Sequence, residues 1–274
     1  MKKLGIIAGN GALPLCLISA CEQSKRPYFV IALKGAMAPD SLRKDQPHAW
    51  VRLGAIGKAL RLLKKEGVEE VVMIGGVSRP SFVGLFPDWR GFKLLLKIGR
   101  KALGDDALLK MLIAEIESEN MTVTGIDKIL PHLLIKKGVY GRILPTQQDM
   151  ADIKRGVQVA KKLGEVDVGQ AVVVQQGLVL AVEGIEGTDA LIVRSKSLKR
   201  KGGRGVLVKT VKPQQDRRAD LPTIGPSTIQ LAYESGLAGI AVEADSVLFS
   251  QADQAVRLAN QLGLFIIGVE PKWH

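Results

Sequence analysis

Hydrophobic and polar positions in the first half of the chain alternate between short apolar runs and longer amphipathic stretches. Apolar runs bounded by glycine or charge predict strands at Leu4–Ala8, Tyr28–Leu33 and Glu70–Ile74. The stretches Ala55–Glu66 and Gly104–Asn120 repeat apolar residues every three to four positions and predict helices. Strands that alternate with helices at this spacing indicate a Rossmann-like parallel sheet covered by helices.

The second half has a different pattern, in which several strands precede the helices. Strand candidates are Ala171–Val174, Leu178–Val182, Leu191–Val193, Val206–Val208, Ile240–Val242 and Leu264–Val269. The short Gln175-Gln176-Gly177 connection predicts a hairpin between the first two. Helices are expected from Gln147 or Asp149 to about Leu163, and at Ser227–Ser235 and Ser250–Leu262. This half is predicted to be a mixed α/β domain with a core of its own.

Proline and glycine mark a crossover between the halves. Pro131, Pro145, Gly138 and Gly141 fall between the last pattern of the first half and the next helix. We therefore predict an α/β protein of two domains, 1–132 and 149–274, joined by a crossover at 133–148.

Composition describes an ordinary folded protein. Of the 274 residues, 46% are hydrophobic and 24% charged, which excludes disordered and collagen-like classes. The apolar runs fall short of the roughly 18 residues that a membrane span needs. The two cysteines, Cys16 and Cys21, suit neither a disulfide framework nor a zinc site, so a cytoplasmic location is expected.

Charge narrows the class of partner. Lysine and arginine total 39 against 27 aspartate and glutamate, for a net charge of +12. Such a balance favours nucleic acid, phosphate-bearing metabolites or an acidic lipid surface. Aromatic residues make up only 4%, which argues against a base-stacking surface for nucleic acid. An anionic metabolite or a lipid surface is therefore favoured.

Two glycine turns follow predicted strands. Gly9-Asn10-Gly11 occupies the place of a phosphate loop before an apolar helix, although Pro14 stands where a third glycine is usual. Gly75 and Gly76 follow another strand, with Ser78 and Arg79 placed to meet an anion. Both turns are expected at the carboxyl edge of the sheet, where ligands of open parallel sheets bind. Tight turns without a ligand are the alternative.

An aromatic and basic stretch follows the second glycine turn. Phe82–Phe92 carries Phe82, Phe86, Trp89 and Phe92, and Lys93–Leu103 is basic and apolar at helical spacing. Such a stretch can rest on an anionic bilayer or cover an acyl chain. A core-facing helix with a solvated basic face is the alternative, and the pattern alone favours it.

The strongest chemical signal lies in a proline-rich loop. Between Arg194 and Arg218 the chain carries ten basic residues and one acid, Asp216. The prolines and glycine of Lys209–Thr228 forbid a continuous helix, so Asp216 and Asp220 lie on a constrained loop. The two aspartates can bind Mg²⁺ while lysines and arginines neutralise phosphoryl oxygens. Local Asp–Arg pairs on a solvated loop are the alternative.

A second acidic cluster ends a predicted strand. Glu183, Glu186 and Asp189 can add metal-binding or general-base oxygens, and Thr188 can donate to a phosphate. Alternatively, Thr188 caps a short helix and the acids are solvated. The three histidines, His48, His132 and His274, share no motif.

Six collinear blocks resemble a known family, the UDP-2,3-diacylglucosamine pyrophosphatases of lipid A synthesis that are unrelated to calcineurin-like metallophosphoesterases. The blocks are GIIAGNGALP at Gly5, GGVSRP at Gly75, GDDALL at Gly104, GQAVVVQQG at Gly169, AVEGIEGTDAL at Ala181 and KPQQDRRADLPTIGPST at Lys212. Asn10 departs from the glycine expected in the first block.

The resemblance implies a two-domain enzyme with its active site in the cleft between the domains. It implies Mg²⁺-dependent hydrolysis of UDP-2,3-diacylglucosamine to UMP and 2,3-diacylglucosamine 1-phosphate, with attack on the phosphorus nearer the sugar. An essential aspartate is expected at Asp216 or Asp220, and both are candidates to hold Mg²⁺ and position water. Substrate-binding candidates in the same block are Lys212, Gln215, Arg217 and Arg218.

The substrate is a lipid, so the resemblance also implies a cytoplasmic protein at the inner membrane surface, with a homodimer as one option for assembly.

Two other classes of function stay open. A nicotinamide-dependent oxidoreductase requires an acidic residue at the end of the second strand, where Leu33-Lys34-Gly35 stands. A non-enzymatic protein that binds sugar nucleotides or lipids needs the cationic loop but not its paired aspartates.

Overall fold

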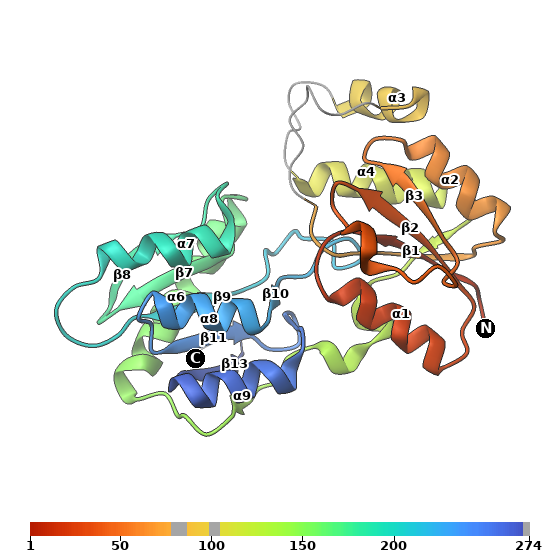
Figure 1. The fold of residues 1–274 in the computed structure, drawn as a ribbon. Helices are drawn as coiled ribbons and strands as arrows, with labels where there is room; N and C mark the ends of the chain where they lie inside the picture. The colour runs from red at the N-terminus through yellow and green to blue at the C-terminus, as the bar shows by residue number, and fades with distance from the viewer. Residues whose placement is uncertain (78–86, 99–104, 271–274) are drawn as a thin grey trace. The chain divides into compact units, whose positions relative to one another are not determined.

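The computed structural model describes residues 1–77, 87–98 and 105–270 (Figure 1). Contacts divide the chain into two compact units. The first contains Met1–Leu130 together with Asp216–Asp220, and the second contains Pro131–Gln215 and Leu221–His274. The segment 133–148, which we expected to be a crossover, belongs to the second unit and supplies a strand to its sheet.

The first unit is built on a parallel sheet, as the sequence predicted. Its strands are β1 (Leu4–Ala8), β2 (Tyr28–Lys34), β3 (His48–Arg52), β4 (Glu70–Ile74) and β5 (Thr122–Val123). They run in the order β3-β2-β1-β4-β5, and each neighbouring pair is parallel. The chain therefore builds outward from β1 to one side and then returns to the other, so the topological switch point lies between β1 and β4.

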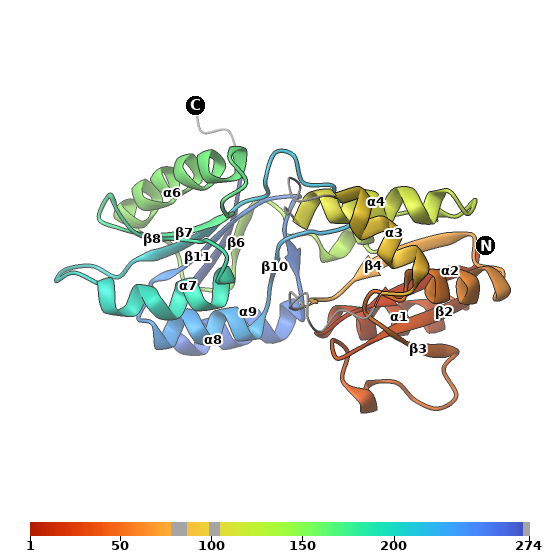
Figure 2. The ribbon, with the colours of Figure 1, turned by 90° about the horizontal axis from the view of Figure 1, so that it is seen from above.

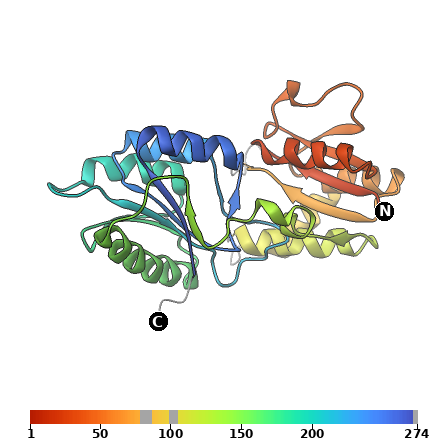
Figure 3. The same ribbon diagram turned by 90° about the horizontal axis from the view of Figure 1, so that it is seen from below.

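Helices cover both faces of this sheet. They are α1 (Leu13–Gln23), α2 (Ile56–Lys65), α3 (Trp89–Ile98), α4 (Asp105–Glu117) and the short α5 (Ile126–Ile129), with a 3₁₀ turn at Pro39–Ser41. Leu60 and Leu63 of α2 and Ile113 and Ile116 of α4 pack with the sheet in one core. Figure 3 shows α1 on the opposite face from α4. Both cysteines lie on α1 as free thiols, with Cys21 buried.

The second unit is built on a mixed sheet. Its strands are β6 (Gly138–Tyr140), β7 (Ala171–Gln175), β8 (Leu178–Val182), β9 (Val206–Lys209), β11 (Gly239–Glu243) and β13 (Phe265–Val269), in the order β6-β13-β11-β9-β7-β8. The central strands β13, β11 and β9 are parallel, and the outer strands are antiparallel to their neighbours. The short strands β10 (Thr223–Ile224) and β12 (Leu248–Phe249) pair separately. The predicted mixed α/β character is confirmed.

Four helices cover this second sheet: α6 (Gln147–Glu165), α7 (Gly187–Ser195), α8 (Pro226–Glu234) and α9 (Ala252–Leu262). Short 3₁₀ turns occur at Pro131–Leu133 and Lys196–Leu198. Figure 2 shows α6 on one face and α7, α8 and α9 on the other. Two separate clusters of buried side chains, one beneath α6 and one beneath the other three helices, make the core.

The predicted hairpin is confirmed between β7 and β8. Gln175 pairs with Leu178, so the loop has two residues, Gln176 and Gly177. Both have positive φ, at 51° and 79°, as the favoured type of two-residue hairpin turn requires. The buried Asp152 of α6 accepts hydrogen bonds from both loop N–H groups, at 2.8 and 2.7 Å. The hairpin is therefore fixed to the helix beneath it.

One predicted strand is wrong. Leu191–Val193, expected to be extended, lies within helix α7. Leu191 and Ile192 are fully buried while Val193 is 55% exposed. An apolar run of three residues has no periodicity of its own, so it does not distinguish a strand from the buried face of a helix.

Candidate active site

The two glycine turns meet at the carboxyl edge of the first sheet, as predicted. Asn10 N–H donates to the carbonyl of Gly76 at 2.7 Å, and Gly76 N–H donates back to the carbonyl of Asn10 at 2.9 Å. A Cβ at Gly9 would lie 2.5 Å from the Gly76 oxygen, and one at Gly75 would lie 2.7 Å from the Asn10 oxygen. Only glycine allows this approach of the two backbones. The paired turns thus close the ends of β1 and β4.

This edge is the switch point of the sheet, where open α/β folds place their ligands. Gly11 has a φ of +102°, and its N–H is accepted by the side-chain oxygen of Asn10 at 2.8 Å. Helix α1 then begins after Ala12, which gives no side-chain cap, so the first-turn N–H groups on either side of Pro14, which itself has none, keep their capacity to bind an anion. Ser78 and Arg79, expected to meet the same anion, lie outside the described residues.

The loop predicted to carry the chemistry makes one turn at Asp216–Asp220. The carbonyl of Asp216 accepts hydrogen bonds from Ala219 N–H at 3.0 Å and Asp220 N–H at 3.2 Å. This segment belongs by its contacts to the first unit, although the rest of its block belongs to the second. Ala219 packs against the core beneath α2 and α4. We name the five residues the DRRAD turn.

Arg218 and Asp216 form a two-pronged ion pair within the DRRAD turn. Arg218 Nε lies 3.0 Å from Oδ1 of Asp216, and Nη2 lies 2.8 Å from Oδ2. The side-chain hydrogen bond from Arg218 is the main reason that the pKa of Asp216 is below its ordinary value, despite partial burial. The same carboxylate raises the pKa of Arg218. Asp216 is therefore an anion throughout the neutral range.

The first unit holds both arginines of the DRRAD turn. Arg218 Nη1 donates to Glu117, at the end of α4, at 3.0 Å. Arg217 donates through Nε and Nη2 to Oδ2 of Asp127, each at 3.3 Å. Asp127 is buried in α5, directly after β5. Gly125 lies against the turn, since a Cβ there would be 2.9 Å from the Arg217 carbonyl.

These contacts place the DRRAD turn beside the carboxyl end of β5. Strands β1, β4 and β5 are neighbours in the sheet, and neighbouring strands lie roughly 4.8 Å apart. The paired glycine turns and the DRRAD turn therefore share one edge, on the order of 10 Å from each other. Backbone N–H groups, two guanidinium groups and two carboxylates are thus gathered along one edge of the sheet.

Asp216 and Asp220 suit a hard divalent cation. They are four residues apart on one backbone turn, and Asp220 is exposed. Over the described ranges, no group of three or more His, Cys, Asp or Glu side chains is gathered to hold a metal ion. Mg²⁺ commonly takes one or two carboxylates and completes its shell with water and substrate phosphates. The donor set therefore fits Mg²⁺ in that form, not a closed protein cage.

The acidic cluster of the second unit has a structural arrangement. Its two glutamates have partners close by: Glu183 accepts hydrogen bonds from Thr188 Oγ1 at 2.8 Å and from Gln170 N–H at 3.1 Å. Glu186 accepts Arg194 at 2.6 Å, which is the main cause of its lowered pKa. These bonds join the end of β8 to the start of α7.

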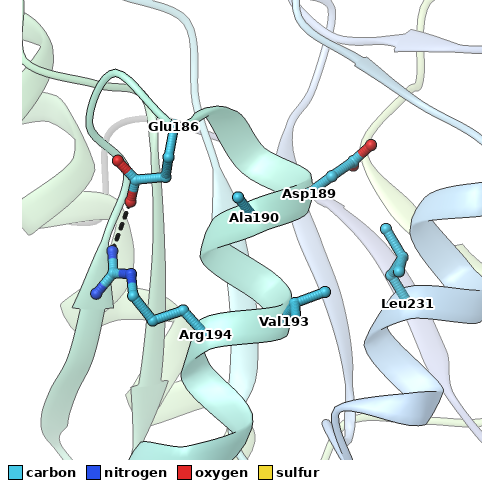
Figure 4. Close-up of a pocket in the computed structure, with 6 residues that line it drawn as sticks. All are labelled: Glu186, Asp189, Ala190, Val193, Arg194 and Leu231. Atoms are coloured by element: carbon cyan, nitrogen blue, oxygen red, sulfur yellow. Dashed lines mark hydrogen bonds and ion pairs between the residues drawn. The ribbon is translucent and has the colours of Figure 1, made fainter.

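A broad, open hollow of about 760 Å³ lies on the outside of α7 (Figure 4). Figure 4 shows Glu186 turned toward Arg194 and Asp189 on the side of Leu231, so the two acids point apart. Ala190 and Val193 complete the lining, and no residue of the Lys209–Thr228 loop contributes to it. The hollow and the strongest sequence motif therefore do not coincide.

Two further candidates of the loop lie in the second unit. Lys212 Nζ binds Asp167 at 2.7 Å, and Lys212 N–H lies 3.4 Å from the side-chain oxygen of Gln215. The structure thus separates the KPQQDRRADLP block into a part held by the second unit and the DRRAD turn held by the first.

Sequence reasoning missed Asp127 and Glu117. They lie 90 and 101 residues from the arginines that they bind. The only local signal was the position of Asp127, just past a glycine that follows a short strand. The sequence alone therefore did not reveal the two carboxylates that hold Arg217 and Arg218 in place.

Nowhere in the described part of the chain is there a helix with the length and hydrophobicity to cross a membrane.

The second strand, β2, ends at Lys34, whereas a dinucleotide-binding unit has an acidic residue there that binds the ribose. The geometry accordingly gives the oxidoreductase alternative no support.

Comparisons with known proteins agree along the whole chain. A family model described as the LpxI N-terminal domain matches residues 3–133, and one described as the LpxI C-terminal domain matches residues 136–267. A UDP-2,3-diacylglucosamine pyrophosphatase LpxI from Caulobacter vibrioides is 42% identical over 281 aligned positions, covering 99% of each chain. Among solved structures, the biotin carboxylase subunit of pyruvate carboxylase aligns at 12% identity with a TM-score of 0.25, covering 63% of this chain and 35% of that one.

Proposed function

Because the chain belongs to the LpxI family, we propose that it is a UDP-2,3-diacylglucosamine pyrophosphatase of lipid A synthesis. In this proposal it hydrolyses the diphosphate bond to release UMP and 2,3-diacylglucosamine 1-phosphate, and it depends on Mg²⁺. Support for the reaction comes from the relative in Caulobacter vibrioides, which is named a UDP-2,3-diacylglucosamine pyrophosphatase and whose length this chain spans almost completely.

One observation carries the chemical part of the proposal: the DRRAD turn holds the ionised carboxylate of Asp216 against the anchored guanidinium of Arg218 and carries a second anchored guanidinium, that of Arg217. Arg218 bridges Asp216 and Glu117, and Arg217 is bound to the buried Asp127. A guanidinium held by a carboxylate on one side has its conformation fixed before substrate arrives, and its remaining N–H groups can meet phosphoryl oxygens. The turn is therefore preorganised for a dianionic diphosphate.

Hydrolysis of such a substrate is slow because its two negative charges repel an anionic nucleophile. Arg217 and Arg218 would bind the phosphoryl oxygens and reduce that repulsion. Asp216 and Asp220 would hold Mg²⁺, which when bound supplies further charge neutralisation and acidifies coordinated water. One of the two carboxylates would orient the attacking water or accept its proton. We assign the attack to the phosphorus nearer the sugar.

The remaining substrate-binding candidates take supporting roles. The paired turns at Gly9, Asn10, Gly11, Gly75 and Gly76 would place N–H groups of their backbone and of α1 toward the nucleotide phosphate. Glu183, Glu186 and Asp189 stay second-tier candidates. Lys212, which we predicted to bind a phosphoryl oxygen, Gln215 and Thr188 are kept as substrate-binding candidates, although each makes a hydrogen bond or ion pair within its own unit. Ser78 and Arg79 are kept as candidates from the sequence.

Because the proposed substrate is linked to a lipid, we propose that the enzyme works as a peripheral protein at the cytoplasmic surface of the inner membrane. A homodimer is proposed only as one option for its assembly. The membrane proposal rests on the chemistry of the substrate, which carries two acyl chains and a soluble nucleotide.

The test is incubation of the full chain with UDP-2,3-diacylglucosamine in detergent micelles, with Mg²⁺ in one arm and EDTA in the other. The proposal predicts UMP release with Mg²⁺ and its loss with EDTA. Tight binding of the substrate without UMP in either arm would identify a binding protein instead. Equal rates in both arms would keep the pyrophosphatase and remove the metal from the mechanism.

A further inference from the structure

Helix α3 presents aromatic side chains to solvent. Trp89 is 70% exposed and Phe92 is 44% exposed, although both are large apolar residues that proteins usually bury. Their rings stack with centroids 6.0 Å apart and planes 22° from parallel. Lys93 Nζ lies 5.2 Å from the centroid of the Trp89 ring, so a cation borders the aromatic pair. We name these three residues the α3 face.

The opposite side of α3 is fixed by polar contacts to α2. Asp88, just before α3, accepts Gly91 N–H at 2.9 Å and also Lys58 N–H at the start of α2 at 2.9 Å. Burial raises the pKa of Asp88, but these and other backbone N–H donors outweigh it, so the net shift is downward. One carboxylate therefore caps two helices. A Cβ at Gly91 would lie 2.2 Å from the Gly54 carbonyl, which shows how closely the helix is held.

A second polar contact joins α3 to the end of α4. Arg90 donates to Glu115 at 2.6 Å and forms an ion pair with Glu119 at 2.5 Å. Glu119, itself only 16% exposed at its side chain, also binds Lys64 of α2 at 3.0 Å. Figure 1 shows α3 outside α2 and α4, away from the strands.

Residues 88–93, at the start of α3, reverse the arrangement of an ordinary surface helix. Such a helix turns its apolar stripe to the core and its charges to water. Here Asp88 and Arg90 face the protein, while Trp89 and Phe92 face outward. Since the polar contacts fix the helix, the aromatic pair is held outward and cannot simply turn to the core. An exposed apolar face of this kind is typical of an interaction surface.

The chemistry of the face selects the partner. Trp and Phe beside Lys is the combination that amphipathic helices insert at the boundary between lipid headgroups and acyl chains. Helix α3 contains no acidic residue, and the sequence from 93 to 101 carries Lys93, Lys97, Arg100 and Lys101. With a net charge of +12 for the chain, this favours a negatively charged bilayer over an acidic protein groove.

We propose that the α3 face binds the surface of an anionic lipid bilayer, with Trp89 and Phe92 at the headgroup boundary and Lys93 beside the lipid phosphates. This inference rests on the proposed function in one respect, because a diacylated substrate is drawn from a bilayer. The observations that carry it are independent of the active site: an outward aromatic pair, a bordering cation and a polar underside.

The test is flotation of the full chain with vesicles of phosphatidylcholine and phosphatidylglycerol, without substrate, compared with vesicles of phosphatidylcholine alone. Wild-type protein should float with the anionic vesicles. The double substitution Trp89→Ser, Phe92→Ser should weaken partitioning about tenfold or more, because two interfacial aromatic anchors are lost. Lys93→Glu should weaken it at least about fivefold, and more so at low salt. Tyr233→Ser, at an exposed aromatic of the second unit, is the matched control and should bind as wild type does.

Trp89 can also report its own depth. Brominated lipids should quench tryptophan fluorescence in the wild type, and the quenching should fall in Trp89→Phe, which leaves Trp50 and Trp273 unchanged. Wild-type flotation equal on neutral and anionic vesicles, or equal flotation of the double variant and Tyr233→Ser, would overturn the proposal.

The result for the α3 face can be separated from the proposed function. UMP release from substrate in detergent micelles requires no bilayer, so it should survive in the double variant with an unchanged KM. If the double variant instead showed a raised KM in micelles and still bound vesicles as the wild type does, the α3 face would bind the acyl chains of the substrate. That result would also overturn this proposal. Failure of UMP release in the wild type would sink the proposed function and leave the flotation result standing.

Discussion

Arg218 lies across the carboxylate of Asp216, with Nε 3.0 Å from Oδ1 and Nη2 2.8 Å from Oδ2, while its third nitrogen binds Glu117 at 3.0 Å. A planar guanidinium bridges two carboxylates from distant parts of the chain in this arrangement. Its fork geometry is what allows it to engage both oxygens of Asp216 at once. The conformation of the DRRAD turn therefore depends on an arginine and not on positive charge alone.

Arg218→Lys should lower kcat/KM roughly 10- to 100-fold, because lysine keeps the charge but cannot bridge Asp216 and Glu117. The measurement is steady-state UMP release in micelles. Arg43→Lys is the matched control, since Arg43 is an exposed arginine of the first unit that pairs with Glu22 and Asp45. Equal effects of the two substitutions would show that the bridge has no role in turnover.

The acid limb of the pH–rate profile should respond to Arg218. Hydrogen bonding from Arg218 lowers the pKa of Asp216, so the carboxylate stays ionised below the pH at which an ordinary aspartate is protonated. If the anion is the active form, kcat/KM falls only as the pH approaches this lowered pKa. Arg218→Gln removes the lowering and should move the acid limb to higher pH.

The same shift has a consequence for folding. A lowered pKa in the folded state contributes stability above the unfolded pKa, and that contribution is lost as pH falls through the folded pKa. Unfolding monitored between neutral and acid pH should therefore show a smaller acid-side loss in Arg218→Gln than in the wild type. In the pH–rate profile, an acid limb of kcat/KM that stays at the same pH in Arg218→Gln would mean that a group other than Asp216 causes it.

Gly75→Ala should destabilise the first unit, whereas Gly76→Ala should not. Gly75 has a φ of +94° and its added Cβ would lie 2.7 Å from a backbone oxygen, while a Cβ at Gly76 would meet nothing within 4 Å. We expect a cost of about 2 kcal/mol or more for Gly75→Ala. Thermal unfolding measures it, at roughly 2–4 °C of Tm per kcal/mol for a chain of this size. Similar Tm values for the two variants would contradict the close packing of the glycine turns.

Hydrolysis in ¹⁸O-labelled water should place the label in 2,3-diacylglucosamine 1-phosphate. The reason is that attack at the sugar-side phosphorus joins the oxygen of water to that phosphate, and UMP leaves with its original oxygens. Mass spectrometry of both products reads the outcome. Label in UMP would move the attack to the nucleotide-side phosphorus and would require a different placement of the substrate on the DRRAD turn.

Periodicity predicted the buried strands well, because strands covered on both faces read as continuous apolar runs. The bounds expected for Leu4–Ala8 and Glu70–Ile74 are those of β1 and β4. Strand β3 was missed because His48–Arg52 lies at the edge of the sheet, and of its residues only Val51 is buried. An edge strand is hard to predict because much of its surface, and the backbone groups along one side, face water. Its sequence therefore lacks the continuous apolar run of a buried strand.

The candidate site was predictable only in part. The meeting of the glycine turns follows from a local rule, since the carboxyl ends of adjacent parallel strands share an edge. The anchoring of Arg217 by Asp127 does not, because the two residues are 90 positions apart and neither stands in a pattern that refers to the other. Sequence spacing likewise placed Glu183 and Glu186 with possible metal ligands, whereas each binds a residue of its own helix or loop.

The central claim is that the carboxylates of the DRRAD turn perform chemistry and do not merely bind. Asp216→Asn and Asp220→Asn keep the size of each side chain and remove its charge, so they separate these roles. Asp40→Asn, at an exposed aspartate of the first unit, is the matched control. Turnover is measured as UMP release, and substrate affinity by titration under the same micellar conditions.

The decisive measurement is kcat of Asp216→Asn and Asp220→Asn beside their Kd for UDP-2,3-diacylglucosamine. The account predicts that at least one of them loses kcat by roughly 10²–10⁴-fold, with Kd changed far less and Asp40→Asn unaffected. Full turnover in both variants would contradict it.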